Sequence, residues 1–192
     1  MRRPIHQITV AKDGSRATVQ TDFDAVCKDF LDAIDLSPKN EAALFEAHVQ
    51  MIVWGVLFVE GLSNRKLYQV TRKEFRKAEF VPYYWALTKQ SRLQDKLMFL
   101  AEYAGVKVTT YKPLLNRFNR MIEERNRLFH YKEVPTEFDF PTLRQKLEIN
   151  APLNDWLKHA PLPQIVTELF STPLVDRQAT ISQVERLLER IT

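Results

Sequence analysis

Apolar side chains recur every three or four positions along most of this chain, which is the spacing of amphipathic helices. Ahead of them, two short β-prone runs within Ile8–Val19 flank Asp13 and Gly14, a pair typical of a hairpin turn. A first helix is predicted from Thr21–Asp24, which has the pattern of a capping box, to about Ser37. The pattern therefore predicts an all-α, up-and-down helical bundle in which strand is confined to a short N-terminal β-hairpin.

The most apolar stretch is Met51–Val59, inside a long helix that we expect to begin at Asn40 and to run to about Tyr68. Because this stretch is apolar on nearly every side, it should be the most buried element of the fold. It is too short to span a bilayer and ends at a charged residue, Glu60. Thr71–Glu74 has the pattern of another capping box, which predicts that a new helix begins there.

The segment Tyr111–Lys132 predicts the helix that carries the candidate chemistry. Its apolar stripe contains Leu114, Leu115, Phe118, Met121, Ile122 and Phe129. Asn126 and His130 are four residues apart and share one flank of this helix. At about 100° per residue, Arg125 falls within the apolar stripe, where an unpaired guanidinium would cost several kcal/mol. We therefore expect an anionic partner for Arg125. Glu60 is the candidate, unless its carboxylate instead reaches solvent.

The chain changes character after Pro135, where prolines separate short amphipathic pieces. Gln178–Ile191 predicts a last helix with an apolar face formed by Ile181, Val184, Leu187, Leu188 and Ile191. We expect three parts: an N-terminal hairpin arm over residues 1–20, a helical core over 21–135, and a C-terminal helical extension over 136–192. The extension is expected to pack on the core or on a partner chain.

Composition narrows the class of protein. With 192 residues and 45% hydrophobic side chains, the chain is long enough to bury a core. The single cysteine, Cys27, lies on the apolar stripe of the first predicted helix, and the four histidines form no metal-type pair. We therefore expect Cys27 to be structural and predict neither a metal site nor a cofactor. The N-terminus has no signal-peptide core, so we expect a cytoplasmic protein with no membrane partner.

Positive charge is concentrated between Ser63 and Lys96, where aromatic side chains are interleaved with lysines and arginines. Together with a net charge of +4, this pattern is suited to single-stranded nucleic acid, because cations contact phosphates while aromatic rings stack on bases. The candidate RNA-binding residues are Arg72, Arg76, Lys77, Arg127 and Tyr131. The alternative interpretation is a solvated helix face beside ordinary core aromatics.

Arg125 and Asn126, followed by three residues and His130, form a spacing that resembles the motif of the HEPN superfamily (higher eukaryotes and prokaryotes nucleotide-binding domains). The resemblance covers roughly residues 40–133 and includes Ser91–Gly105 ahead of the motif helix. It implies an all-helical HEPN-type bundle and, as in many members of the family, a metal-independent endoribonuclease. The catalytic residues that it implies are Arg125, Asn126 and His130, to which the charge argument adds Glu60 as a supporting residue.

These side-chain types suit RNA cleavage without a metal ion. His130 can transfer protons near neutral pH, Arg125 can hold phosphoryl oxygens with two hydrogen bonds, and Asn126 can orient either group. The expected products are a 2′,3′-cyclic phosphate and a 5′-hydroxyl. Structural roles stay open for each residue: helix capping for His130 and Asn126, and a buried ion pair for Arg125.

RNA and a second copy of this chain are the expected partners. On an ideal helix Arg125 and His130 lie about 140° apart, so one helix does not readily direct both at one phosphate, whereas a symmetric dimer brings them together across its interface. The family resemblance implies the same shared cleft and, by analogy, a toxin–antitoxin or antiviral phage-defence setting with an antitoxin or other regulatory protein. One alternative is a non-catalytic HEPN module that binds a nucleotide, RNA or a partner protein. The other is a plain helical interaction protein whose motif is a coincidence.

Overall fold

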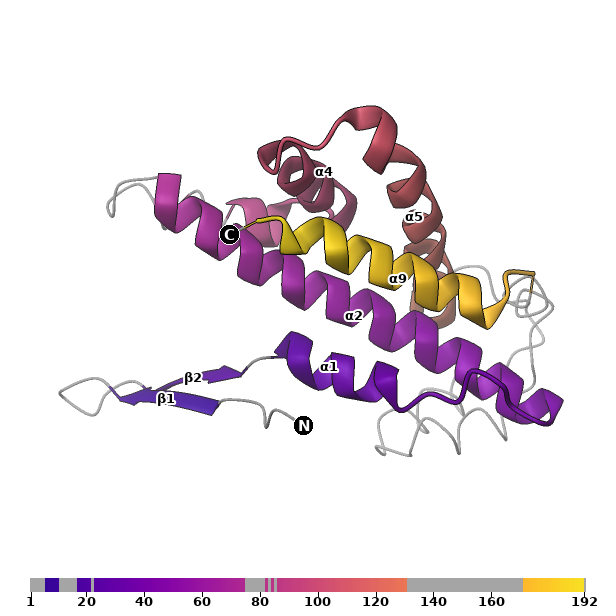
Figure 1. The fold of residues 1–192 in the computed structure, drawn as a ribbon. Coiled ribbons are helices and arrows are strands. Elements are labelled where there is room, and N and C mark those ends of the chain that lie inside the picture. The colour runs from indigo at the N-terminus through magenta and orange to yellow at the C-terminus, as the bar shows by residue number, and fades with distance from the viewer. Residues whose placement is uncertain are drawn as a thin grey trace.

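The fold is known from a computed structural model that describes residues 6–10, 17–21, 23–74, 82, 84, 86–130 and 171–191, with backbone alone for 6–10, 17–21 and 127–130. Its helices are α1 (Phe23–Asp32), α2 (Glu41–Glu74), α4 (Leu93–Tyr103), α5 (Val108–His130) and α9 (Leu174–Glu189), with a π-helical turn η1 (Ala86–Gln90) before α4. Strands β1 (His6–Val10) and β2 (Ala17–Thr21) pair antiparallel ahead of α1 (Figure 1). The body of the protein is helical, which confirms the all-α expectation.

Helix α2 is the element around which the other helices pack, since α1, α4, α5 and α9 all contact it (Figure 1). Its central stretch is apolar on nearly every side, and Met51, Ile52, Val56 and Val59 are completely buried. A helix that is hydrophobic all round needs neighbours all round. The four surrounding helices supply them.

Length and composition would also allow α2 to cross a membrane, because its most apolar 18-residue window has a mean hydropathy of 1.7. Within the fold, 61% of that window is buried by the rest of the protein. The central helix of a packed bundle meets the same criterion. This is the one described helix that does so.

The predicted helix start at Thr71–Glu74 is wrong, because α2 continues without a break to Glu74. Thr71 is completely buried, and its hydroxyl donates a hydrogen bond to the carbonyl of Leu67 at 2.7 Å. A threonine that bonds the carbonyl four residues earlier sits inside a helix rather than capping one. The apolar stripe through Leu67 and Val70 carries α2 past the expected end at Tyr68.

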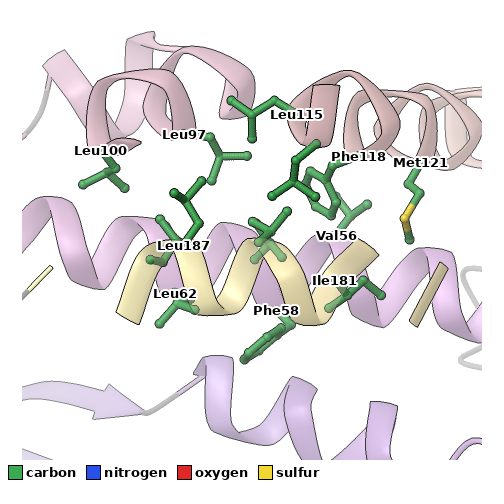
Figure 2. Packing of buried hydrophobic residues seen from close by; sticks show 14 of the residues in the cluster. Val56, Phe58, Leu62, Leu97, Leu100, Leu115, Phe118, Met121, Ile181 and Leu187 are labelled. Atoms are coloured by element: carbon green, nitrogen blue, oxygen red, sulfur yellow. The ribbon is translucent and has the colours of Figure 1, made fainter. Parts of the chain in front are cut away.

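Helix α9 lies against both α2 and α5, and all three helices meet at Gly55. A Cβ atom on Gly55 would clash with Cδ1 of Ile181 and would lie 3.5 Å from Cε of Met121. The absence of a side chain at Gly55 therefore permits the close approach of α9. Figure 2 shows Ile181 and Met121 entering this junction from α9 and α5.

The directions of the three helices follow from their polar contacts. Lys66 near the C-terminal end of α2 donates to the carbonyl of Ile191 at 2.6 Å, so α9 runs parallel to α2. Arg117 in the first half of α5 donates to Gln183 in the second half of α9 at 2.7 Å, so these two helices are antiparallel. Helices α2 and α5 are therefore adjacent and antiparallel, as predicted.

Candidate functional site

The candidate catalytic residues lie in the last two turns of α5, which ends at His130. The buried stripe of α5, including Phe118 and Met121, packs in the core and fixes how these last turns are rotated. Arg125 and Asn126 follow the stripe and are half-buried. The Nε atom of Arg125 is buried, and no hydrogen-bond partner for it lies among the described residues. Because a buried donor without an acceptor costs about 1–3 kcal/mol, Arg125 would gain from an added anionic acceptor.

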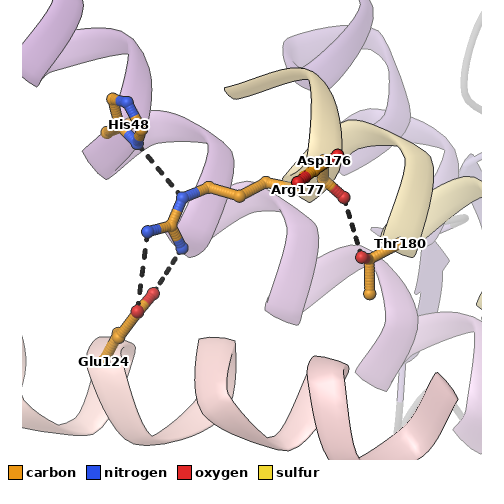
Figure 3. Close-up of polar contacts among 5 residues, drawn as sticks. All are labelled: His48, Glu124, Asp176, Arg177 and Thr180. Carbon is orange, nitrogen blue, oxygen red and sulfur yellow. Dashed lines mark hydrogen bonds and ion pairs between the residues drawn. The ribbon is translucent and has the colours of Figure 1, made fainter. Parts of the chain in front are cut away.

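A polar cluster of His48, Glu124 and Arg177 joins α2, α5 and α9 (Figure 3), and its Glu124 is the residue before Arg125 in the chain. Arg177 is only 2% exposed, and its Nε donates a hydrogen bond to Nδ1 of His48 at 3.1 Å. Its terminal nitrogens form an ion pair with the carboxylate of Glu124, contacting both oxygens. Because a buried guanidinium is tolerated only when it is paired, this cluster fixes the register of α5 against α9.

His48 is held neutral inside this cluster. Its pKa is lowered from the usual 6.5 to about 4, first because burial penalises the charged imidazolium and then because Arg177 is positively charged. Its Nδ1 accepts a hydrogen bond from Arg177, which only a neutral imidazole can do. At neutral pH His48 is therefore a structural acceptor.

Glu60 does not form the ion pair with Arg125 that the sequence suggests. Both side chains are described, and no ion pair joins them within the described part of the chain. The two residues are too far apart along the axis of α2. Glu124, the neighbour of Arg125 on α5, is joined through Arg177 to His48 of α2. Glu60 lies roughly 18 Å further along α2 than His48, at the regular rise of a helix. Glu60 lies instead near Lys96 of α4. Burial lowers the pKa of Lys96, and the charge of Glu60 offsets part of that change.

Five of the residues selected from the sequence have side chains outside the described part of the structure: His130, Arg127, Arg76, Lys77 and Tyr131. Arg72 is described and lies exposed in the last turn of α2. The structure thus places Arg125 and Asn126 next to each other at the half-buried end of α5. The position of the His130 imidazole relative to them stays a prediction.

Arg177 is the residue of this region that the sequence pattern did not reveal. The predicted last helix begins at Gln178, so Arg177 fell one residue outside it. With α9 beginning at Leu174, Arg177 lies on the buried stripe that also contains Ile181 and Val184. An arginine within an apolar stripe is the same signal that singles out Arg125, so a longer helix would have revealed it.

Cys27, the single cysteine, adds no reactive thiol to this region. Cys27 on α1 is completely buried, and its pKa is raised to about 11, first by burial and then by the nearby charge of Asp24. It therefore stays a protonated thiol, consistent with the predicted structural role. In the ranges that the structure describes, no group of three or more His, Cys, Asp or Glu side chains is placed to hold a metal ion.

Comparison with protein-family models, with curated proteins and with solved structures finds no match to this chain. The function must therefore be argued from the residues and their geometry.

Proposed function

We propose that this chain is a metal-independent endoribonuclease of HEPN type, with Arg125, Asn126 and His130 at its catalytic site. The observation that carries the proposal is the state of Arg125, a half-buried cation with no ion pair among the described residues and a buried Nε without an acceptor. The adjacent carboxylate of Glu124 is already held by Arg177. A phosphodiester would supply the missing anion, because its oxygens accept two hydrogen bonds from one guanidinium.

The proposed reaction uses the nucleophile that RNA carries. His130 removes the proton from the 2′-hydroxyl, the 2′-oxygen attacks phosphorus, and the bond from phosphorus to the 5′-oxygen breaks. The imidazolium then returns the proton to the departing 5′-oxygen. Arg125 stabilises the negative charge that develops on the phosphoryl oxygens, and Asn126 orients the phosphate. The products are a 2′,3′-cyclic phosphate and a 5′-hydroxyl.

The same family resemblance supplies the wider setting of the proposal. The helices would form a HEPN-type bundle to which the N-terminal hairpin is attached, and two copies would form two composite sites at a dimer interface, each with Arg125 from one chain and His130 from the other. The protein would act in the cytoplasm as a toxin or phage-defence ribonuclease, restrained by an antitoxin or another regulatory protein.

Incubation of the purified protein with labelled RNA in excess EDTA tests this function. We expect cleavage to continue, with 2′,3′-cyclic phosphate ends, because no step uses a metal ion. His130→Ala should lower the rate by roughly 10²–10⁴-fold, the usual contribution of a general acid–base group. His6→Ala, which removes a histidine from β1, is the matched control and should cleave at the wild-type rate.

Circular dichroism of His130→Ala should match the wild type, which separates a catalytic role from a structural one. Turnover that stops in EDTA, or that persists in His130→Ala, would contradict the proposal. Specific RNA binding without any cleavage would favour the non-catalytic HEPN module instead.

A further inference from the structure

The space between α5 and α9 forms a cationic groove, which we define by Arg117 on α5, by Arg186 on α9 and by Arg190, the residue that follows α9. These three arginines surround a pocket of about 340 Å³, a volume within the range of roughly 300–1,000 Å³ of ligand sites. Apolar side chains, including Pro113, Leu114 and Leu187, form its remaining walls. Among the described residues that line it, none is acidic.

The charges in the C-terminal half of α9 are sorted between two sides of the helix. Glu185 pairs with Lys28 of α1 at 2.9 Å, and Glu189 lies near Lys66 of α2, so these two acidic residues face α1 and α2. Arg186 and Arg190 are one turn apart on the side toward α5, where both are exposed. Within the described ranges neither arginine has an ion-pair partner. No described carboxylate therefore neutralises the charges of Arg186 and Arg190.

The groove continues past Arg117 into a second hollow of about 250 Å³, which Arg117 also lines together with Arg120. Glu124 and Asp176 also border this second hollow; the carboxylate of Glu124 is bound by Arg177, and Asp176 is exposed. Arg117 is held at the junction of the two hollows by its hydrogen bond to Gln183. Cationic groups thus continue from the groove into the second hollow, and the groove itself, with no acidic residue in its described lining, is the part that matches a ligand with repeated negative charges.

We infer that this groove binds single-stranded nucleic acid, with Arg117, Arg186 and Arg190 on successive phosphates and the apolar walls against sugars and bases. Arginine suits this role because its planar guanidinium binds phosphate oxygens through two hydrogen bonds. A groove that combines cations with apolar surface is the common arrangement for single strands. The inference adds a contact surface to the proposed function and shares its substrate class, but it does not depend on cleavage.

Fluorescence anisotropy with a labelled 2′-O-methyl oligouridine tests the groove, because this strand lacks the attacking hydroxyl and stays intact. The double variant Arg186→Ala/Arg190→Ala removes two exposed cations that have no described ion-pair partner, so its fold should be unchanged. Affinity should fall about tenfold or more, because hydrogen bonds to charged groups are worth about one to two powers of ten each. The salt dependence of log Kobs should lose about 0.7 in slope for each phosphate contact removed.

The matched control is Lys39→Ala/Lys107→Ala, which removes the same charge from two exposed positions that line neither hollow and lie outside the basic segment Ser63–Lys96. Wild-type affinity and slope in this control, with weaker binding in the groove variant, would support the inference. Equal losses in both variants, or no loss in the groove variant, would overturn it.

Competition with polyglutamate separates nucleic acid from an acidic protein partner. Displacement of the oligouridine by polyglutamate at the same charge concentration would assign the groove to acidic peptides and overturn the inference. Weak competition would support it. Cleavage that depends on Arg125 and His130 is measured with ordinary RNA in a separate assay. A groove that does not bind the oligouridine would therefore contradict this inference without contradicting the proposed ribonuclease function.

Discussion

Arg125 and Arg177 each interrupt the apolar stripe of a helix, and they differ in what surrounds the guanidinium. Arg177 is almost fully buried and is bound by His48 and Glu124. Arg125 is half-buried, with no acceptor for its Nε among the described residues. A buried and paired arginine contributes to the specificity of packing, whereas an arginine that keeps an open hydrogen-bond donor is suited to a ligand.

His48 should make the stability of the protein depend on pH. Its pKa is about 4 in the folded protein, below the usual 6.5, so between these values the unfolded chain binds the extra proton and the folded chain does not. Stability should therefore be complete above about pH 6.5 and fall as the pH drops toward about 4, by at most about 1.4 kcal/mol per pH unit. Urea denaturation across this range measures the effect.

His48→Asn provides the control for this pH dependence, because an amide oxygen can accept the hydrogen bond from Arg177 but the side chain does not titrate. The stability of this variant should change less between about pH 5 and about pH 7 than that of the wild type. An identical pH profile in both proteins would show that another group is responsible.

At the residue scale, the sequence predicted which side chains are unusual better than it predicted their partners. Arg125 stands out because periodicity alone reveals a cation on an apolar stripe. The expected ion pair between Arg125 and Glu60 is not formed. Periodicity shows on which face of its own helix a residue lies, but it does not show which residues of a neighbouring helix lie opposite that face. Register between helices is set by tertiary contacts, here those of Arg177 and Gly55.

The junction of α2, α5 and α9 depends on Gly55, which has no side chain where Ile181 packs. Overpacking a core usually costs about 1–3 kcal/mol, and alanine gains about 1 kcal/mol over glycine within a helix. Gly55→Ala should therefore destabilise the fold by a net amount of up to about 2 kcal/mol. Ile181 is 1% exposed, so its side chain cannot turn into solvent to relieve the clash. Chemical denaturation measures the change.

A double-mutant cycle with Ile181→Val separates this clash from other causes. The valine lacks the Cδ1 atom that the new Cβ would meet, so the double variant should be more stable than the sum of the two single changes predicts. Additive effects would mean that Gly55 is not limited by Ile181.

At the scale of elements, the predicted helices were found with shifted ends. α2 passed its predicted stop because a buried threonine inside a helix and a threonine that caps one have the same sequence pattern. α9 begins four residues before Gln178. Its start is set by Pro173, which occupies the N-cap position, and not by the first residue of the apolar periodicity. Such errors change which residues are assigned to a face, and the omission of Arg177 followed from one of them.

At the scale of the whole molecule, the antiparallel neighbours α2 and α5 followed from the sequence, but the position of α9 did not. The apolar face of a helix predicts that another part of the protein, or a partner, packs against it. It does not predict which element does so. α9 covers α2 and α5 within the same chain, at the place where the buried cluster and the cationic groove are formed.

The proposed composite site can be tested by mixing inactive Arg125→Ala and His130→Ala proteins under conditions in which subunits exchange. A heterodimer would hold one cross-chain site with both groups intact, so cleavage should return to roughly a quarter of the wild-type level after random exchange. Sites contained within single chains would each lack one group and stay silent. A silent mixture with verified exchange, or a monomer by light scattering, would count against the shared site.

The contact between Arg177 and His48 joins positions 129 residues apart in the chain, which has a consequence for the order of assembly. Helices α2, α4 and α5 are nearer to one another in sequence, and bringing them together costs less chain entropy than docking α9. While α9 is undocked, His48 and Glu124 lack Arg177, and the groove lacks the wall that carries Arg186 and Arg190. Docking of α9 is therefore the step that fixes the register of α5 against α9 and completes the groove. A folding intermediate in which α9 has not docked would be helical but would lack this binding surface.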